Sequence, residues 1–226
     1  LGLALAIDAA AWALVRGAMG KVGAVGGGAI GGLVLAFKKG LVDDLVPAGP
    51  RGLREHLRSV ASGHMTTGLL KVAVIAGSAV LVIALQPERP TSVAVLGVVL
   101  LAACSNVWNG LDVVPGRSLK AFLLPALAFA IWGTPSDAPA VVGLLVGAIV
   151  VLPFDLRETA MLGDAGANLL GFAAGIALYD ALPDPWVAVA AGIAVGLNVV
   201  AETVSFSGVI ERIPPLRWVD ALGRRV

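Results

Sequence analysis

Apolar residues gather in long blocks that are separated by short polar segments. We count eight such blocks, at residues 1–15, 22–37, 69–86, 91–107, 121–133, 139–153, 167–182 and 186–204. A membrane-spanning helix needs about 20 mainly apolar residues, with about 17 as the lower limit. The pattern therefore predicts an all-α, polytopic membrane helical bundle with about eight transmembrane helices. Several blocks are short and Pro125 interrupts one of them, so we expect tilted and kinked helices.

The polar segments alternate between a short set and a longer, more charged set. The short segments are 16–21, 87–90, 134–138 and 183–185, and the longer ones are 38–68, 108–120, 154–166 and 205–226. Thirteen of the sixteen Lys and Arg residues lie in the longer segments or at their flanks. Because basic residues accumulate on the cytoplasmic side of a membrane protein, we expect the longer loops to face the cytoplasm.

Composition agrees with a lipid environment. The chain is 58% hydrophobic and 14% charged, whereas a soluble domain carries about a quarter charged residues. The net charge of +1 and the lack of a basic stripe with aromatic residues argue against a nucleic-acid partner. A single cysteine, Cys104, excludes an internal disulfide and a cysteine-cluster metal site, and only two histidines are present.

We interpret residues 1–226 as one transmembrane domain with a cytoplasmic or interfacial tail at 205–226. Pro214 and Pro215 are expected to break any helix in that tail, and Trp218 among arginines suits the headgroup layer. The chain starts with Leu1 inside an apolar run, from which we expect that a preceding segment is missing.

Polar groups lie at the membrane boundary in three of the four longer loops. They are Asp43-Asp44, the run with Asn106, Asn109 and Asp112, and the run with Arg157, Glu158 and Asp164. Each group alone has a structural explanation: charges at a helix end, an interhelical hydrogen bond, or a turn. Asn106 and Asn109, three residues apart, are expected to share one helix face.

Taken together, these groups indicate phosphoryl transfer at the cytoplasmic interface. Carboxylates and other oxygen donors suit Mg²⁺, which is usually bound by one or two carboxylates plus substrate phosphates. Arginine and lysine nearby would bind phosphate. The glycines that flank Asp164 allow the backbone to approach a ligand closely.

The motifs also resemble those of a known family. The spacing N-x-x-N-x-x-D-x-x-x-G at Asn106, Asn109, Asp112 and Gly116 resembles the central motif of the polyprenyl-phosphate N-acetylhexosamine-1-phosphate transferases, glycosyltransferase family 4. This superfamily includes the phospho-MurNAc-pentapeptide translocase and UDP-GlcNAc:undecaprenyl-phosphate transferases. The run M-L-G-D-A-G-A-N-L-L-G-F at 161–172 is similar to its M-G-D-x-G-S-x-x-L-G-F motif, and Asp43-Asp44 matches its aspartate pair. The family would place a further helix before Leu1.

The resemblance implies a reaction and roles for the residues. A UDP-sugar and a polyprenyl phosphate would give polyprenyl-diphospho-sugar and UMP, for cell-wall or related glycan biogenesis in a bacterial plasma membrane. Asp164 would be the ligand of Mg²⁺, or of Mn²⁺ in its place, and Asp43 or Asp44 would hold or deprotonate the lipid phosphate. Asn106, Asn109 and Asp112 would orient the nucleotide and diphosphate. Lys71, Arg117 and Arg157 are further candidates for phosphate contacts.

Some features depart from the family pattern and leave alternatives open. The lysine expected after the aspartate pair and the histidine cluster of the MurNAc-pentapeptide branch are both missing, so the sugar stays undefined. An inactive membrane homologue or partner subunit is one alternative. A transporter is another, although it needs ionisable residues near the bilayer midplane, and here Asp8 lies clearly within an apolar block while Glu202 lies near the end of another. The sequence also leaves open whether the chain acts alone or as a homodimer.

Overall fold

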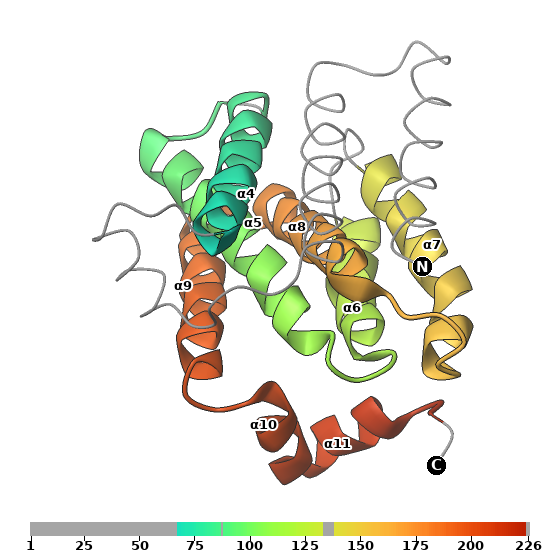
Figure 1. The fold of residues 1–226 in the computed structure, drawn as a ribbon. Coiled ribbons are helices and arrows are strands. Elements are labelled where there is room, and N and C mark those ends of the chain that lie inside the picture. The colour runs from blue at the N-terminus through green and yellow to red at the C-terminus, as the bar shows by residue number, and fades with distance from the viewer. Residues whose placement is uncertain (1–66, 87, 133–137, 225–226) are drawn as a thin grey trace.

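A computed structural model describes residues 67–86, 88–132 and 138–224, which form eight helices and no strand (Figure 1). The helices are α4 (Thr67–Ala84), α5 (Thr91–Leu111), α6 (Arg117–Trp132), α7 (Ala138–Leu156), α8 (Gly163–Ala181), α9 (Asp184–Ala201), α10 (Phe206–Arg212) and α11 (Pro214–Ala221). Six of the eight predicted apolar blocks each correspond to one of the long helices. The blocks 1–15 and 22–37 lie outside the described residues. The prediction of an all-α fold is thus confirmed for the described part of the chain.

The number of membrane spans agrees only in part with the prediction. Within the described residues, α5 and α9 are long and apolar enough to cross a membrane, which is fewer than the eight spans expected. Within the described residues, α4 and α7 contain the shorter apolar stretches Val72–Ala84 and Val141–Leu156. Helix α6 has only 16 residues and begins with Arg117, and α8 carries Asp164 in its first turn.

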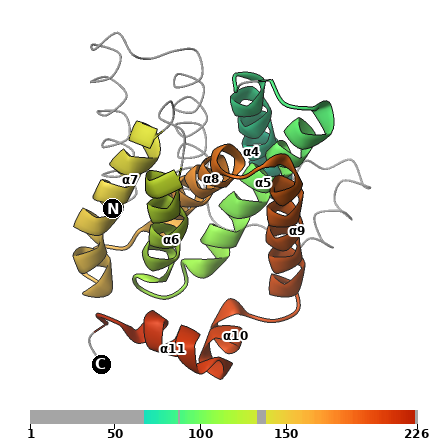
Figure 2. The same cartoon turned by 180° about the vertical axis from the view of Figure 1, so that it is seen from behind.

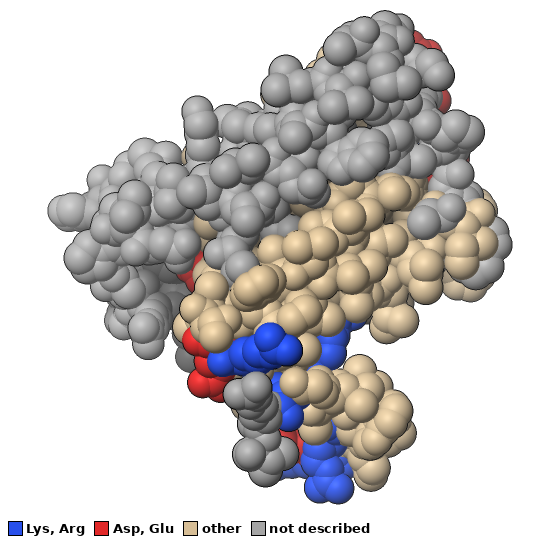
Figure 3. Space-filling view, turned by 90° about the vertical axis from the view of Figure 1, so that its right-hand side faces the viewer, with Lys and Arg blue, Asp and Glu red and all other residues tan. Residues whose placement is uncertain are grey.

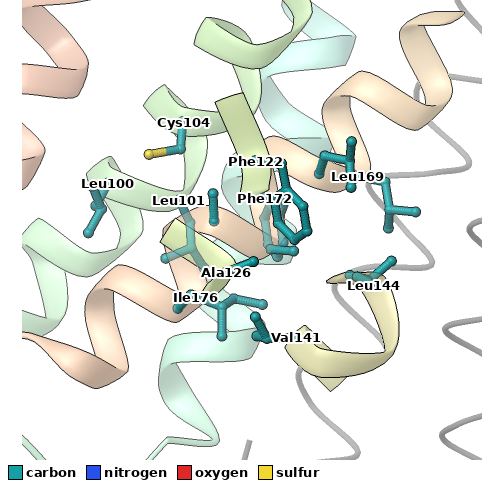
Figure 4. Close-up of a cluster of buried hydrophobic side chains, with 14 of the residues drawn as sticks. Leu100, Leu101, Cys104, Phe122, Ala126, Val141, Leu144, Leu169, Phe172 and Ile176 are labelled. Carbon is teal, nitrogen blue, oxygen red and sulfur yellow. The ribbon is translucent and has the colours of Figure 1, made fainter. Parts of the chain in front are cut away.

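Helix α5 lies at the centre of the described bundle (Figures 1 and 2). It packs most extensively against α8, and then against α9 and α4, while α6 packs against α7 and α8. Figure 4 shows the core that these helices share, in which the rings of Phe122 and Phe172 meet aliphatic side chains of α5, α7 and α8. Phe122, Leu144 and Phe172 are completely buried.

The outer faces of the bundle are apolar as well. Large exposed apolar side chains include Val95, Leu124, Ile149, Val150 and Ile193, each at least half exposed. A soluble protein rarely exposes apolar surface on so many elements at once. The space-filling view shows a broad uncharged face with charged atoms gathered at its lower border (Figure 3). This distribution is what contact with lipid requires.

Charged groups gather at one end of the bundle, which we name the loop end. It comprises the last turns of α5, α7 and α9, the first turns of α6 and α8, and the tail α10–α11. Of the Lys and Arg side chains that the structure describes, all except Arg89 lie at this end. The loops 112–116 and 157–162 therefore share one face of the bundle, as the sequence predicted.

The prolines interrupt the helix of the tail, as expected, but short helices form on either side of the interruption. Pro214 and Pro215 separate two short helices and occupy the first turn of α11. A helix tolerates proline there because the first N–H groups have no partner inside the helix. The result is a helical tail that lies across the loop end, beneath α6 (Figure 1).

Candidate functional site

Two glycines allow α8 to approach the backbone of α5 closely. A Cβ atom on Gly171 would lie 2.5 Å from the carbonyl oxygen of Cys104, and one on Gly175 would lie 2.8 Å from the Cα atom of Leu101. The glycines are four residues apart and so face the same neighbour. Small residues are used in this way in membrane bundles, where no hydrophobic force drives helices together. The contact fixes the last turns of α5 beside the first turns of α8.

A buried carboxamide joins these two helices above the contact. The Ser105 hydroxyl donates to Asn168 Oδ1 at 3.0 Å, and Asn168 Nδ2 donates to Asn109 Oδ1 at 3.2 Å. The same Nδ2 donates to the backbone oxygen of Asp164 at 2.6 Å. Asn168 is fully buried. Our sequence reasoning did not single it out, although it lies one turn after Asp164 within the quoted run.

This network joins the two helix ends that carry the predicted site residues Asp112 and Asp164. Asp112 caps the C-terminus of α5, three residues after Asn109, and Asp164 lies in the first turn of α8. Both carboxylates are partly exposed and both take part in further interactions. A helix C-terminus carries partial negative charge, so a carboxylate there is unfavourable unless a cation compensates it. The end of α5 therefore favours a cation beside Asp112.

The donor set fits Mg²⁺, the ion that the motif resemblance implies. Carboxylate and carboxamide oxygens are hard ligands, and two carboxylates together with substrate phosphates are enough for this ion. Among the described residues, no group of three His, Cys, Asp or Glu side chains comes together. Asp43 and Asp44 lie outside the described residues, so the predicted approach of this pair to Asp112 and Asp164 stays a prediction.

A buried carboxylate, Asp155, fastens the loop after Asp112 to the loop before Asp164. Its Oδ2 accepts from the backbone N–H of Gly116 at 2.7 Å, and its Oδ1 accepts from that of Leu162 at 3.0 Å. Gly116 has a φ of +75°, which a side chain would strain. Asp155 thus ties the loop after Asp112 to the loop before Asp164. One feature of the sequence points to Asp155: it is an acidic residue directly after an apolar block.

Asn106 and Asn109, three residues apart on α5, bind different helices. Asn106 Nδ2 donates to Asn198 Oδ1 of α9 at 2.5 Å, whereas Asn109 is bonded to α8. Asn198 Nδ2 in turn donates to the Ala103 oxygen of α5 at 3.0 Å. Both asparagines therefore make the interhelical hydrogen bonds that were one of the alternatives open from sequence. Asn106 remains exposed and Asn109 partly exposed.

The basic candidates lie in three different settings. Arg117 is buried and forms a bidentate pair with Asp220 of the tail, with Nε–Oδ1 at 2.8 Å and Nη2–Oδ2 at 3.0 Å. Arg157 is exposed in the loop before α8. Lys71 belongs to α4, but its side chain is outside the described residues. Arg157 is therefore the better placed of the two described arginines for a phosphate contact.

Comparison with known proteins agrees with the motifs. The model of glycosyl transferase family 4 matches residues 27–181, more than half of the chain. That range holds every candidate site residue, from Asp43 to Asp164, and ends before α9. Neither the curated proteins nor the solved structures gave a match. The chain belongs to glycosyl transferase family 4, and is accordingly a member of a family of transferases.

Proposed function

We propose that this protein transfers a sugar-1-phosphate, an N-acetylhexosamine-1-phosphate by resemblance, from a UDP-sugar to polyprenyl phosphate. An oxygen of the lipid phosphate attacks the sugar-bearing phosphorus of the UDP-sugar. A new P–O bond forms as the bond to the UMP oxygen breaks, and UMP leaves with the electron pair. The products are polyprenyl-diphospho-sugar and UMP, so charge and atoms balance.

The observation that carries this proposal is the hydrogen bond from Asn168 to Asn109. It joins the two most family-like motifs, which lie far apart in sequence, at the end of the bundle where the charges gather. A membrane-bound phosphate and a soluble nucleotide can meet only at such a boundary. This supports a site between the end of α5 and the start of α8.

The residues have separable roles in this proposal. Asp112 and Asp164 would hold Mg²⁺, which neutralises developing phosphate charge when it is bound. Asn109, held by Asn168, orients the diphosphate, and Asn106 borders the same turn of α5. Asp43 or Asp44 positions the lipid phosphate. Because a phosphate monoester is already largely ionised near neutral pH, positioning and charge compensation contribute more than proton removal.

We place the site at the cytoplasmic face of a bacterial plasma membrane. The basic residues at the loop end support this orientation under the rule that cytoplasmic loops are enriched in Lys and Arg. UDP-sugars are made in the cytoplasm, so the orientation also gives the site access to its soluble substrate.

The test is release of UMP by the purified full-length protein, reconstituted with undecaprenyl phosphate, Mg²⁺ and a panel of UDP-sugars. We expect UMP release with at least one UDP-sugar, and none when undecaprenyl phosphate is left out. No release with any sugar, from a protein shown to be folded, would reject the transferase and favour an inactive homologue.

A further inference from the structure

Hydrogen bonds and ion pairs attach the tail to the first turn of α6. Besides its bidentate pair with Asp220, Arg117 donates from Nη1 to the Ser207 hydroxyl at 2.8 Å. Lys120 Nζ donates to the backbone oxygens of Val219 at 3.0 Å and Leu222 at 3.2 Å. Arg224 also pairs with Asp220. These contacts hold α11 at the level where the apolar faces of the bundle end.

The side of α11 turned away from Arg117 is apolar. Successive residues of an α-helix are about 100° apart, so Trp218 lies about 200° round the helix from Asp220. Trp218 is 66% exposed, and Val219 and Leu222 are each exposed by more than two fifths. In Figure 3 the uncharged surface of the tail lies below the uncharged face of the bundle, with Lys and Arg atoms between and beneath them.

Two arginines accompany this apolar surface without acidic partners. Arg212 and Arg217 are exposed, and neither forms an ion pair with a described residue. Of the two acidic residues of the tail, Asp220 is engaged by Arg117 and Arg224, and Glu211 is exposed beside Arg212. The outward surface of the tail therefore offers an exposed indole, aliphatic side chains and unpaired positive charge.

From these observations we propose that α10–α11 is an interfacial anchor that binds anionic lipid headgroups. Trp218 and its apolar neighbours enter the boundary between headgroups and acyl chains, where tryptophan is favoured. Arg212 and Arg217 bind the headgroup phosphates, since arginine forms bidentate contacts with phosphate. This surface lies outside the region matched to the family and is independent of the transfer reaction.

The experiment places a polarity-sensitive fluorophore on the tail of the full-length protein. Ala221→Cys keeps Trp218, Val219 and Leu222, and Cys104→Ala removes the thiol that lies within residues 1–226. The protein is reconstituted in nanodiscs of phosphatidylcholine or of an equal mixture with phosphatidylglycerol, each doped with a lipid that carries a quencher near the headgroup. In the mixed discs we expect the fluorophore to report an apolar environment and to be quenched by the lipid. In pure phosphatidylcholine we expect both changes to be weaker.

Arg212→Gln with Arg217→Gln is the test variant, and Arg212→Lys with Arg217→Lys is its charge-matched control. Each basic residue near an anionic surface contributes about 1 kcal/mol, so the glutamine pair should shift the bound-to-detached ratio about 30-fold. The lysine pair should behave as the wild type. Equal quenching in both lipids and both variants would overturn the proposal. The proposal would also be overturned if the probe reported an apolar environment without quenching by lipid, while Cys at position 221 cross-linked two copies of the protein. That result would assign the surface to a second chain.

Discussion

Replacing Gly171 with alanine should push α8 away from α5 and disrupt the candidate site. The new methyl carbon would lie 2.5 Å from the Cys104 oxygen and 2.8 Å from the Cα atom of Ser105. Carbon atoms in contact are about 3.5–4.0 Å apart, so one helix must move by about 1 Å. Both close atoms belong to the backbone of α5, which cannot turn aside as a flexible side chain would.

Three terms set the size of the effect. Overpacking of this kind costs about 1–3 kcal/mol. Loss of the Asn109–Asn168 hydrogen bond adds about 0.6 kcal/mol, the average for interhelical bonds in a membrane bundle. Alanine in place of glycine returns up to about 1 kcal/mol through helix propensity. The expected net destabilisation is about 1–3 kcal/mol. A shift of about 1 Å at a reacting centre can also lower turnover about a hundredfold.

Gly192→Ala in α9 is the matched control, because no atom lies within 4 Å of the position its Cβ would occupy. Thermal unfolding in mild detergent and UMP release should be measured for both variants. The control should be as stable as the wild type or slightly more stable, and equally active. A Gly171→Ala protein with wild-type stability and turnover would refute the close packing of α5 on α8.

Three further outcomes are expected. Asp155→Ala should destabilise the protein by about 1–3 kcal/mol, because two buried N–H groups lose their acceptor. Glu158→Ala on the exposed loop should not destabilise it. Equal unfolding temperatures for the two variants would contradict the structural role of Asp155. Burial raises the pKa of Asp220, but hydrogen bonds and charge from Arg117 and Arg224 outweigh it, so the pKa lies below its ordinary value. The stabilisation that the Asp220 carboxylate gives to the docked tail should therefore be fully present above its unfolded pKa of about 3.9. It should be lost only as the pH falls through the lower pKa of the folded state. Tail protease resistance that is constant from neutral pH to about pH 5 checks this, whereas loss near pH 6 would contradict it. Val113 and Pro185 are both exposed. A thiol reagent that does not cross the membrane should label a cysteine at position 185 in intact cells, and should label one at position 113 only after the cells are opened. Labelling of the cysteine at position 113 from outside would reverse the topology.

The sequence was sufficient to predict the positions of the helices. Apolar blocks are local features, and each of the six blocks in the described part of the chain matches a helix to within a few residues. Among the described residues, α5 and α9 meet a length-and-composition test for a membrane span, and α4 and α7 contain the shorter apolar stretches Val72–Ala84 and Val141–Leu156. Block length does not show how polar a helix end is. The first turns of α6 and α8 contain Arg117 and Asp164, which shorten their apolar stretches.

The partners of the polar residues could not be predicted from sequence. A three-residue spacing places Asn106 and Asn109 on neighbouring parts of one helix, but it does not show that α9 contacts the first and α8 the second. Arg117 looked like a phosphate ligand because its partner, Asp220, is far away in the chain. Asp155 went unnoticed because a buried carboxylate that accepts two backbone N–H groups has no local motif.

The most direct measurement of the central claim is UMP release by Asp164→Asn in the full-length protein with Mg²⁺. Asparagine keeps the size of the side chain but removes the charge that would hold the metal, so turnover should fall at least about a hundredfold, or about 3 kcal/mol. Asp184→Asn, an exposed aspartate paired with Arg89 at the opposite end of the bundle, should leave turnover unchanged. Wild-type turnover in the Asp164 variant would contradict the proposed metal site.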